Sequence, residues 1–375
     1  MRAPGRTPAP CGPPYGPRSR TAAQPHRRNG QVLSLLTGAW SLEWSTGVFL
    51  VAAAVTVVCS VRLATLGDIL ADRTGWGEAL FGAVLFGLIT SLSGIVMTAV
   101  SAAADRPTLA YSNAVGGIAA QTLAVVVADA FHRRVNLEHA AASPSNLLFG
   151  CLLTGLLGVA LMASFSPEVT LLGVHPASIV LIALYWGGVR LIREHGEPMW
   201  RAVRTRETLP DVPDEQPATG RGTRALWTEF ALIAVLVMAG GWAVARAAER
   251  LLDLTGMNAG FVGAVLMGVV NALPETVAAV AAVRRGALTL AVAAIIGGNC
   301  LDVLNLAVGD LVFRGGSLFH AAGTSELFLT STALVMTTVL LGGLLVRQKR
   351  GWWKLGFDGV LLTTVYLCSV AVLAF

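Results

Sequence analysis

Long apolar runs separated by short polar segments dominate the chain. A transmembrane helix needs about 20 consecutive apolar residues, and runs of this length recur from residue 47 to the end. We therefore expect an all-α integral membrane protein with about ten transmembrane helices. The pattern places the spans at 47–66, 78–103, 108–130, 146–165, 170–193, 225–248, 258–283, 287–312, 324–346 and 353–374.

Two polar segments define the expected organisation. Residues 1–30 are rich in Pro, Gly and Arg, cannot bury a core, and are expected to form a disordered basic tail. Pro residues interrupt that tail where a secretory signal would need an apolar stretch. A second polar segment, 194–224, separates a first set of five spans in 31–193 from a second set in 225–375.

The two halves also resemble each other in sequence. Shifted by 181 positions without a gap, the separation of Leu70 from Leu251, LADRTG aligns with LLDLTG. In the same register Gly116-Gly117 meets Gly297-Gly298 and Asp129 meets Asp310. Matches of Gly, Thr and Asp indicate an internal duplication. Because five is an odd number, the repeats should be inverted in the membrane, as in secondary transporters that bind substrate near the midplane.

Two acidic residues interrupt apolar segments of the second half. Glu275 follows Asn271 and Pro274, and Asp302 lies further along the chain. A charged side chain at bilayer depth is costly and usually functional, and Pro274 removes a backbone donor and kinks a helix. The pair therefore predicts an ion site beside loosened helix backbone.

Structural readings of the same acids stay open. Glu275 could be a neutral carboxyl that bonds Thr90 or Ser91 across the repeat interface. Asp302 has Asn299 and Asn305 three residues away on either side, so it could belong to a polar seam between packed helices.

Composition narrows the function classes. The chain is 54% hydrophobic and 13% charged, whereas soluble domains carry about a quarter charged residues. The sequence has no nucleotide-binding P-loop, no CxxC pair, no His cluster at membrane depth and no basic patch interleaved with aromatics. We expect no enzyme, no cofactor and no nucleic-acid partner, but a lipid-embedded monomer or homo-oligomer.

Charge distribution predicts the topology. The side that holds the central segment carries about seventeen basic residues against about four on the other side, the tail left out, which favours a cytoplasmic central segment and external termini. Abundant Ala, Gly and Arg, with Lys349 and Lys354 as the two lysines, suggest a bacterial genome and hence the bacterial plasma membrane.

A family resemblance follows from these residues. NALPE at 271–275, RRG at 284–286 and GGNCLD at 297–302 resemble the second alpha-repeat of the sodium/calcium exchanger (cation/calcium antiporter) superfamily, prokaryotic ten-helix type. Its pattern there is G-T-S-x-P-E followed by G-S-N-x-x-[ND]. The resemblance implies that Glu275 and Asp302 are the charged metal ligands. It places Asn271 at the Thr position, whereas Ala272 and Gly298 replace two serines.

The first repeat departs further from that pattern. ITSLSG at 89–94 keeps the hydroxyls of Thr90 and Ser91 but puts Gly94 where the first glutamate belongs. Gln121 falls opposite Asp302. The resemblance then implies a site of two carboxylates with neutral ligands from Thr90, Ser91, Gln121, Asn271 and Asn299.

The implied activity is exchange of calcium for sodium, or of a cation for protons, by alternating access. Losing a glutamate and two serines weakens the case for several bound ions and makes proton coupling a rival. The alternative is an exchanger-fold membrane protein that no longer transports and serves as a scaffold or sensor.

Overall fold

The computed structural model describes residues 40–74, 91–132, 135–141, 143–171, 173–194, 222–286, 288–349 and 356–374. Helices form nearly all of this part of the chain, and its one β-bridge joins Leu171 to Val174. The elements are α2 (Leu42–Thr74), α5 (Leu92–Ala103), α6 (Pro107–Phe131), α7 (Leu137–Ala140), α8 (Pro144–Ala163), α9 (Pro176–Glu194), α10 (Thr223–Thr255), α11 (Ala259–Phe261), the π-helix η2 (Val262–Met267), α12 (Gly268–Arg285), α13 (Leu288–Val312), α14 (Thr324–Val346) and α15 (Phe357–Ala374).

The membrane-spanning character of the helices confirms the expected fold class. Eight spans in the described residues are long and apolar enough to cross a bilayer, and α5 and the Pro176–Ile192 part of α9 are shorter apolar helices. The span expected at 78–103 is described only from Ser91 onward. The tail at 1–30 and most of the central polar segment, 195–221, lie outside the described residues.

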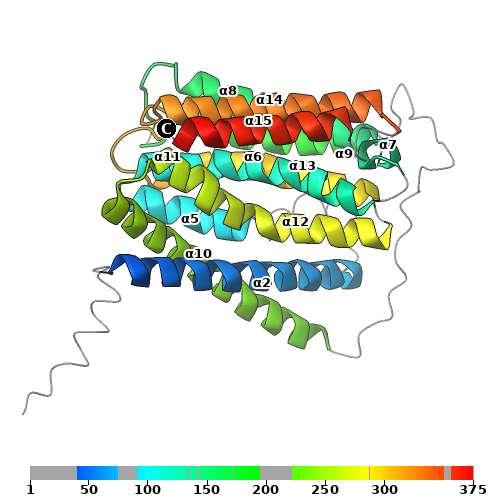
Figure 1. Ribbon diagram of the computed structural model, residues 1–375, viewed down its shortest axis with the longest axis horizontal. Helices are drawn as coiled ribbons and strands as arrows, with labels where there is room; N and C mark the ends of the chain where they lie inside the picture. Colours follow the sequence, from blue (N-terminus) through cyan, green and yellow to red (C-terminus); the bar gives the residue numbers. More distant parts are fainter. Residues whose placement is uncertain are drawn as a thin grey trace, which may run out of the picture. The chain divides into compact units, whose positions relative to one another are not determined.

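Two helices, α6 and α13, form the centre of the bundle. They are the most buried of the spanning helices, and they pack against each other. Figure 1 shows α2 and α10 along one side of them and α14 and α15 along the other. The α2–α10 pair has its own small apolar clusters, around Leu63 with Val237 and around Leu66 with Leu226. This pair is therefore packed separately from the main core.

The helix boundaries repeat with the separation found in the sequence. The bounds of α10 lie 181 residues after those of α2, and the bounds of α13 lie the same distance after those of α6. Local bonding repeats as well, because Asp129 Oδ1 accepts from the backbone N–H of Leu137 at 2.6 Å and Asp310 Oδ1 accepts from that of Leu318 at 2.9 Å. Each aspartate ties the end of a central helix to the segment that follows it.

Asp310 makes further bonds that predict its contribution to stability. Its Oδ2 accepts from the backbone N–H of His175 at 2.7 Å and from Ser178 Oγ at 2.8 Å. Asp310→Ala strands these buried donors, each at about 1–3 kcal/mol, so we expect a clear drop in the thermal unfolding midpoint of the detergent-purified protein.

Asp253→Ala is the matched control for that measurement. Asp253 pairs with Arg106 at the surface, and such ion pairs contribute about 0–1 kcal/mol. Equal midpoints for the two variants would contradict the assignment of Asp310 as a buried anchor.

Candidate ion-binding site

The backbone of the second half is irregular where it approaches α6. The π-helix η2 leads directly into α12, which contains Pro274 in its interior. A Cβ built on Gly116 would lie less than 3.0 Å from the Cα of Ala264, and one on Gly268 would lie 2.9 Å from the carbonyl carbon of Gly116. Glycine thus lets the two backbones almost touch, which is how small residues act between membrane helices. The crossing brings α12 alongside the part of α6 that carries Gln121.

Asp302 lies at the centre of the site, fully buried on α13. Gln121 Nε2 donates to its Oδ2 at 2.5 Å, and Asn271 Nδ2 donates to the same oxygen at 3.3 Å. Asn305 Nδ2 donates to Oδ1 at 3.1 Å. Three helices, α6, α12 and α13, therefore supply the amide donors that a buried carboxylate requires.

Glu275 is the second acid of the site, 3% exposed. It follows Asn271 by four residues in α12, a spacing that puts both side chains on one face of a helix. Asn271 contacts Asp302, and Glu275 lies one turn further along the same face of α12.

The other expected ligands are placed unequally. Ser91 is fully buried at the start of α5, and its hydroxyl lies beside the Asp302 carboxylate. Asn299 is buried one turn before Asp302, but its Nδ2 donates to Thr122 Oγ1 at 3.1 Å instead of reaching the carboxylate. Thr90 lies outside the described residues.

Several buried amide oxygens on α6, α12 and α13 have no hydrogen-bond partner within the described part of the chain. They are Oδ1 of Asn113, Asn271 and Asn299 and Oε1 of Gln121. An unsatisfied buried acceptor costs about 1–3 kcal/mol, and a hard cation such as Ca²⁺ binds oxygens of this kind. No group of three or more His, Cys, Asp or Glu able to hold a metal is found among the described residues, so neutral oxygens would have to complete a metal site.

Sequence reasoning missed Asn113, which lies eight residues before Gln121 on α6. Its Nδ2 donates to the carbonyl of Gly94 at 3.3 Å and to Thr98 Oγ1 at 2.9 Å. The sequence signal for Asn113 is a single amide residue within an apolar run. Asn113 ties the first turn of α5 to α6 next to the site.

A second group of buried acids lies away from the site, at the ends of helices. Burial and the negative charges of Asp358 and Asp129 raise the pKa of Glu138 in α7 well above its ordinary value. Glu138 is hydrogen-bonded to Asp358 at the start of α15. The group joins α7 to α15. Sequence patterns do not predict it, because acids near span ends usually meet water.

The contact between Gln121 and Asp302 predicts the effect of adding charge. Gln121→Glu would place two carboxylates side by side, which costs about 4 kcal/mol at 4 Å and an effective dielectric constant of 20. We expect a lower thermal unfolding midpoint at pH 8 and partial recovery at pH 5, where the pair can share a proton. Gln348→Glu, at a water-accessible helix end, is the control. An unchanged midpoint at pH 8 would contradict this geometry.

Comparisons with known proteins identify the family of the chain. The family model described as sodium/calcium exchanger protein matches residues 44–191 and 225–375. The sodium/calcium exchanger MaX1 of Methanosarcina acetivorans is 30% identical over 121 residues, which cover 32% of this chain and 33% of that protein. The match thus spans about a third of the relative.

Solved structures share the fold at low sequence identity. The H⁺/Ca²⁺ exchanger CAX superimposes with a TM-score of 0.63 and 12% identity over 92% of this chain and 89% of that one. The sodium-calcium exchanger NCX_Mj gives 0.58 and 16% identity over 87% and 97%. YfkE gives 0.61 and 14% identity over 92% and 95%. The chain is an integral, multi-pass membrane protein and belongs to the sodium/calcium exchanger family.

Proposed function

We propose that the protein is a secondary active cation antiporter that exchanges calcium for sodium, or a cation for protons, across the membrane. The observation that carries the proposal is that Glu275 and Asp302 are both buried in spanning helices, and that buried amide oxygens of Gln121 and Asn271, the neighbours of Asp302, have no hydrogen-bond partner among the described residues. Membership of the exchanger family supports the same class of activity. We propose no enzymatic reaction and no nucleic-acid partner.

Charge balance suggests how the site could work. Two carboxylates balance one calcium ion, and amide oxygens can supply further ligands. When the cation leaves, a buried charge left alone costs several kcal/mol, so protonation of Glu275 or the arrival of sodium would be needed to replace it. The amides of Gln121 and Asn271 can offer N–H groups to Asp302 or oxygen to a cation, because a carboxamide carries both functions.

The α2–α10 pair is our candidate for the moving part. Gly240 of α10 packs against Thr56 of α2, whereas a Cβ on its neighbour Gly241 would lie 2.9 Å from the carbonyl oxygen of Ser93. The pair therefore touches the start of α5 beside the site while its apolar clusters stay separate from the main core. Sliding of packed helices is an established way to change access.

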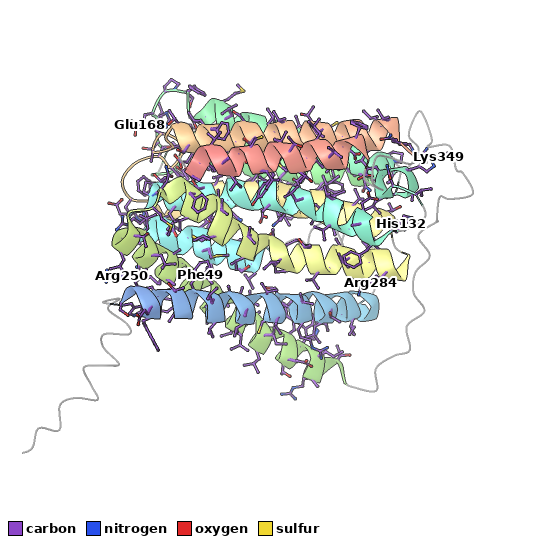
Figure 2. The ribbon with its side chains drawn as sticks, viewed as in Figure 1. Phe49, His132, Glu168, Arg250, Arg284 and Lys349 are labelled. Carbon is purple, nitrogen blue, oxygen red and sulfur yellow. The ribbon has the colours of Figure 1, made fainter. Side chains whose placement is uncertain are left out.

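We further propose that the repeats, 31–193 and 225–375, are inverted in a bacterial plasma membrane with segment 194–224 in the cytoplasm. In Figure 2, His132, Arg284 and Lys349 lie at one end of the bundle, and Glu168 and Arg250 lie at the opposite end. In the sequence, Arg133-Arg134 directly follow His132 and the basic stretch from Arg347 to Lys354 includes Lys349, so the charge bias supports a cytoplasmic location for this end.

A second candidate is an exchanger fold that no longer transports and acts as a scaffold or sensor. The observation in its favour is that Asp302 receives amide hydrogen bonds from Gln121, Asn271 and Asn305. Such a polar seam would hold helices together by itself.

Ion flux into proteoliposomes distinguishes the two candidates. With calcium on one side and a sodium or pH gradient across the membrane, we expect Glu275→Gln and Asp302→Asn to lose at least about tenfold in rate, equivalent to about 1.4 kcal/mol. Glu168→Gln, in the exposed loop between α8 and α9, should transport like the wild type. Absence of flux in folded wild-type protein would refute the antiporter, and full flux in Glu275→Gln would refute the role of Glu275 as an ion ligand.

A further inference from the structure

The two halves of the chain contribute unequally to the site. Under the repeat separation of 181 residues, Gln121 is the counterpart of Asp302, to which it is bonded, and Gly94 is the counterpart of Glu275. Both carboxylates therefore come from the second half. The first half carries an amide and a glycine at the matching positions.

The space beside Gly94 is filled by a side chain from the other half. A Cβ built on Gly94 would lie less than 3.0 Å from Oδ1, Cγ and Nδ2 of Asn271. One on Gly117, in the neighbouring helix α6, would lie 2.9 Å from the same Nδ2. Because real Cβ atoms do not come this close to other heavy atoms, position 94 cannot carry a side chain while Asn271 keeps its place.

The counterpart of Gly117 shows that this crowding is local to Asn271. A Cβ on Gly298 would meet only Gln121 Oε1, at 3.9 Å, which is ordinary contact. A side chain at 298 would therefore fit its surroundings, whereas one at 94 or 117 would require the Asn271 amide to move.

Asn271 also determines which polar group lies beside Asp302. Its Nδ2 donates to Asp302 at 3.3 Å, and its Oδ1 has no hydrogen-bond partner among the described residues. A neutral amide therefore stands beside Asp302 at the place where an acid at position 94 would add a third negative charge.

We propose that the carboxamide of Asn271, wedged against Gly94 and Gly117, replaces the acidic side chain that the first half lacks and limits the site to one cation at a time. The limit on cations rests on the proposed antiporter function, whereas the steric exclusion at position 94 does not. Two carboxylates balance one divalent charge, and a third would leave an excess that a further cation would balance.

A double-mutant cycle in the purified full-length chain tests the steric part. Gly94→Ala adds a Cβ and no charge, so a fall in the thermal unfolding midpoint would reflect the clash with Asn271. We expect Gly94→Ala alone to lower the midpoint and Gly94→Ala/Asn271→Ala to recover most of that loss relative to Asn271→Ala. Gly158→Ala, whose Cβ would meet nothing within 4 Å, should leave the midpoint unchanged.

Equilibrium dialysis with calcium and sodium tests the cation part on the wild type and on Gly94→Glu/Asn271→Thr. We expect the wild type to bind one calcium per chain with a Hill coefficient no greater than one. Because a third carboxylate adds one negative charge, we expect the variant to bind one sodium together with one calcium. Additive midpoints in the cycle, two calcium ions on the wild type, or no sodium bound beside calcium on the variant would overturn the proposal. A wild type that binds no calcium would refute the antiporter and the one-cation limit together, while coupling between positions 94 and 271 would still establish the steric exclusion.

Discussion

The arrangement of the helix core depends on a buried negative charge at Asp302. A carboxylate removed from water is stable only where hydrogen-bond donors or counter-charges replace the lost solvent. Here Gln121, Asn271 and Asn305 supply the donors from α6, α12 and α13. The three helices must therefore stay in register around one residue, which fixes the middle of the bundle.

Glycine makes that register possible. Gly116 and Gly268 bring the backbones of α6 and the η2–α12 segment into direct contact, which leaves room for short polar side chains only. The π-helix η2 and Pro274 interrupt regular bonding in the same stretch. Close backbones, irregular helix and buried acids coincide, and this is where a membrane protein can expose ligands to an ion without opening its core to lipid.

Much of this fold can be predicted from the sequence. Hydropathy locates the spans because a bilayer demands long apolar helices, and the shift of 181 residues anticipates helix boundaries that recur from α2 to α10 and from α6 to α13. The pairing of Gln121 with Asp302 follows the same shift. The motifs around Pro274 and Asp302 indicated two acids in apolar segments, and both Glu275 and Asp302 are buried.

The details of the site could not be predicted in the same way. Asn299 bonds Thr122, and Asn271 fills the space beside Gly94. Both contacts depend on how far each helix is rotated about its axis and shifted along it. Tertiary packing sets these two quantities, and the local sequence does not reveal them. Asn113 is an isolated amide in the sequence, and in the structure it holds α5 to α6.

The most direct test of the central claim is a structure of the purified protein soaked with strontium and measured for anomalous scattering. The account predicts a peak between α12 and α13, within ligand distance of Glu275 and Asp302; saturating strontium without a peak there, in protein of unchanged fold, would contradict it.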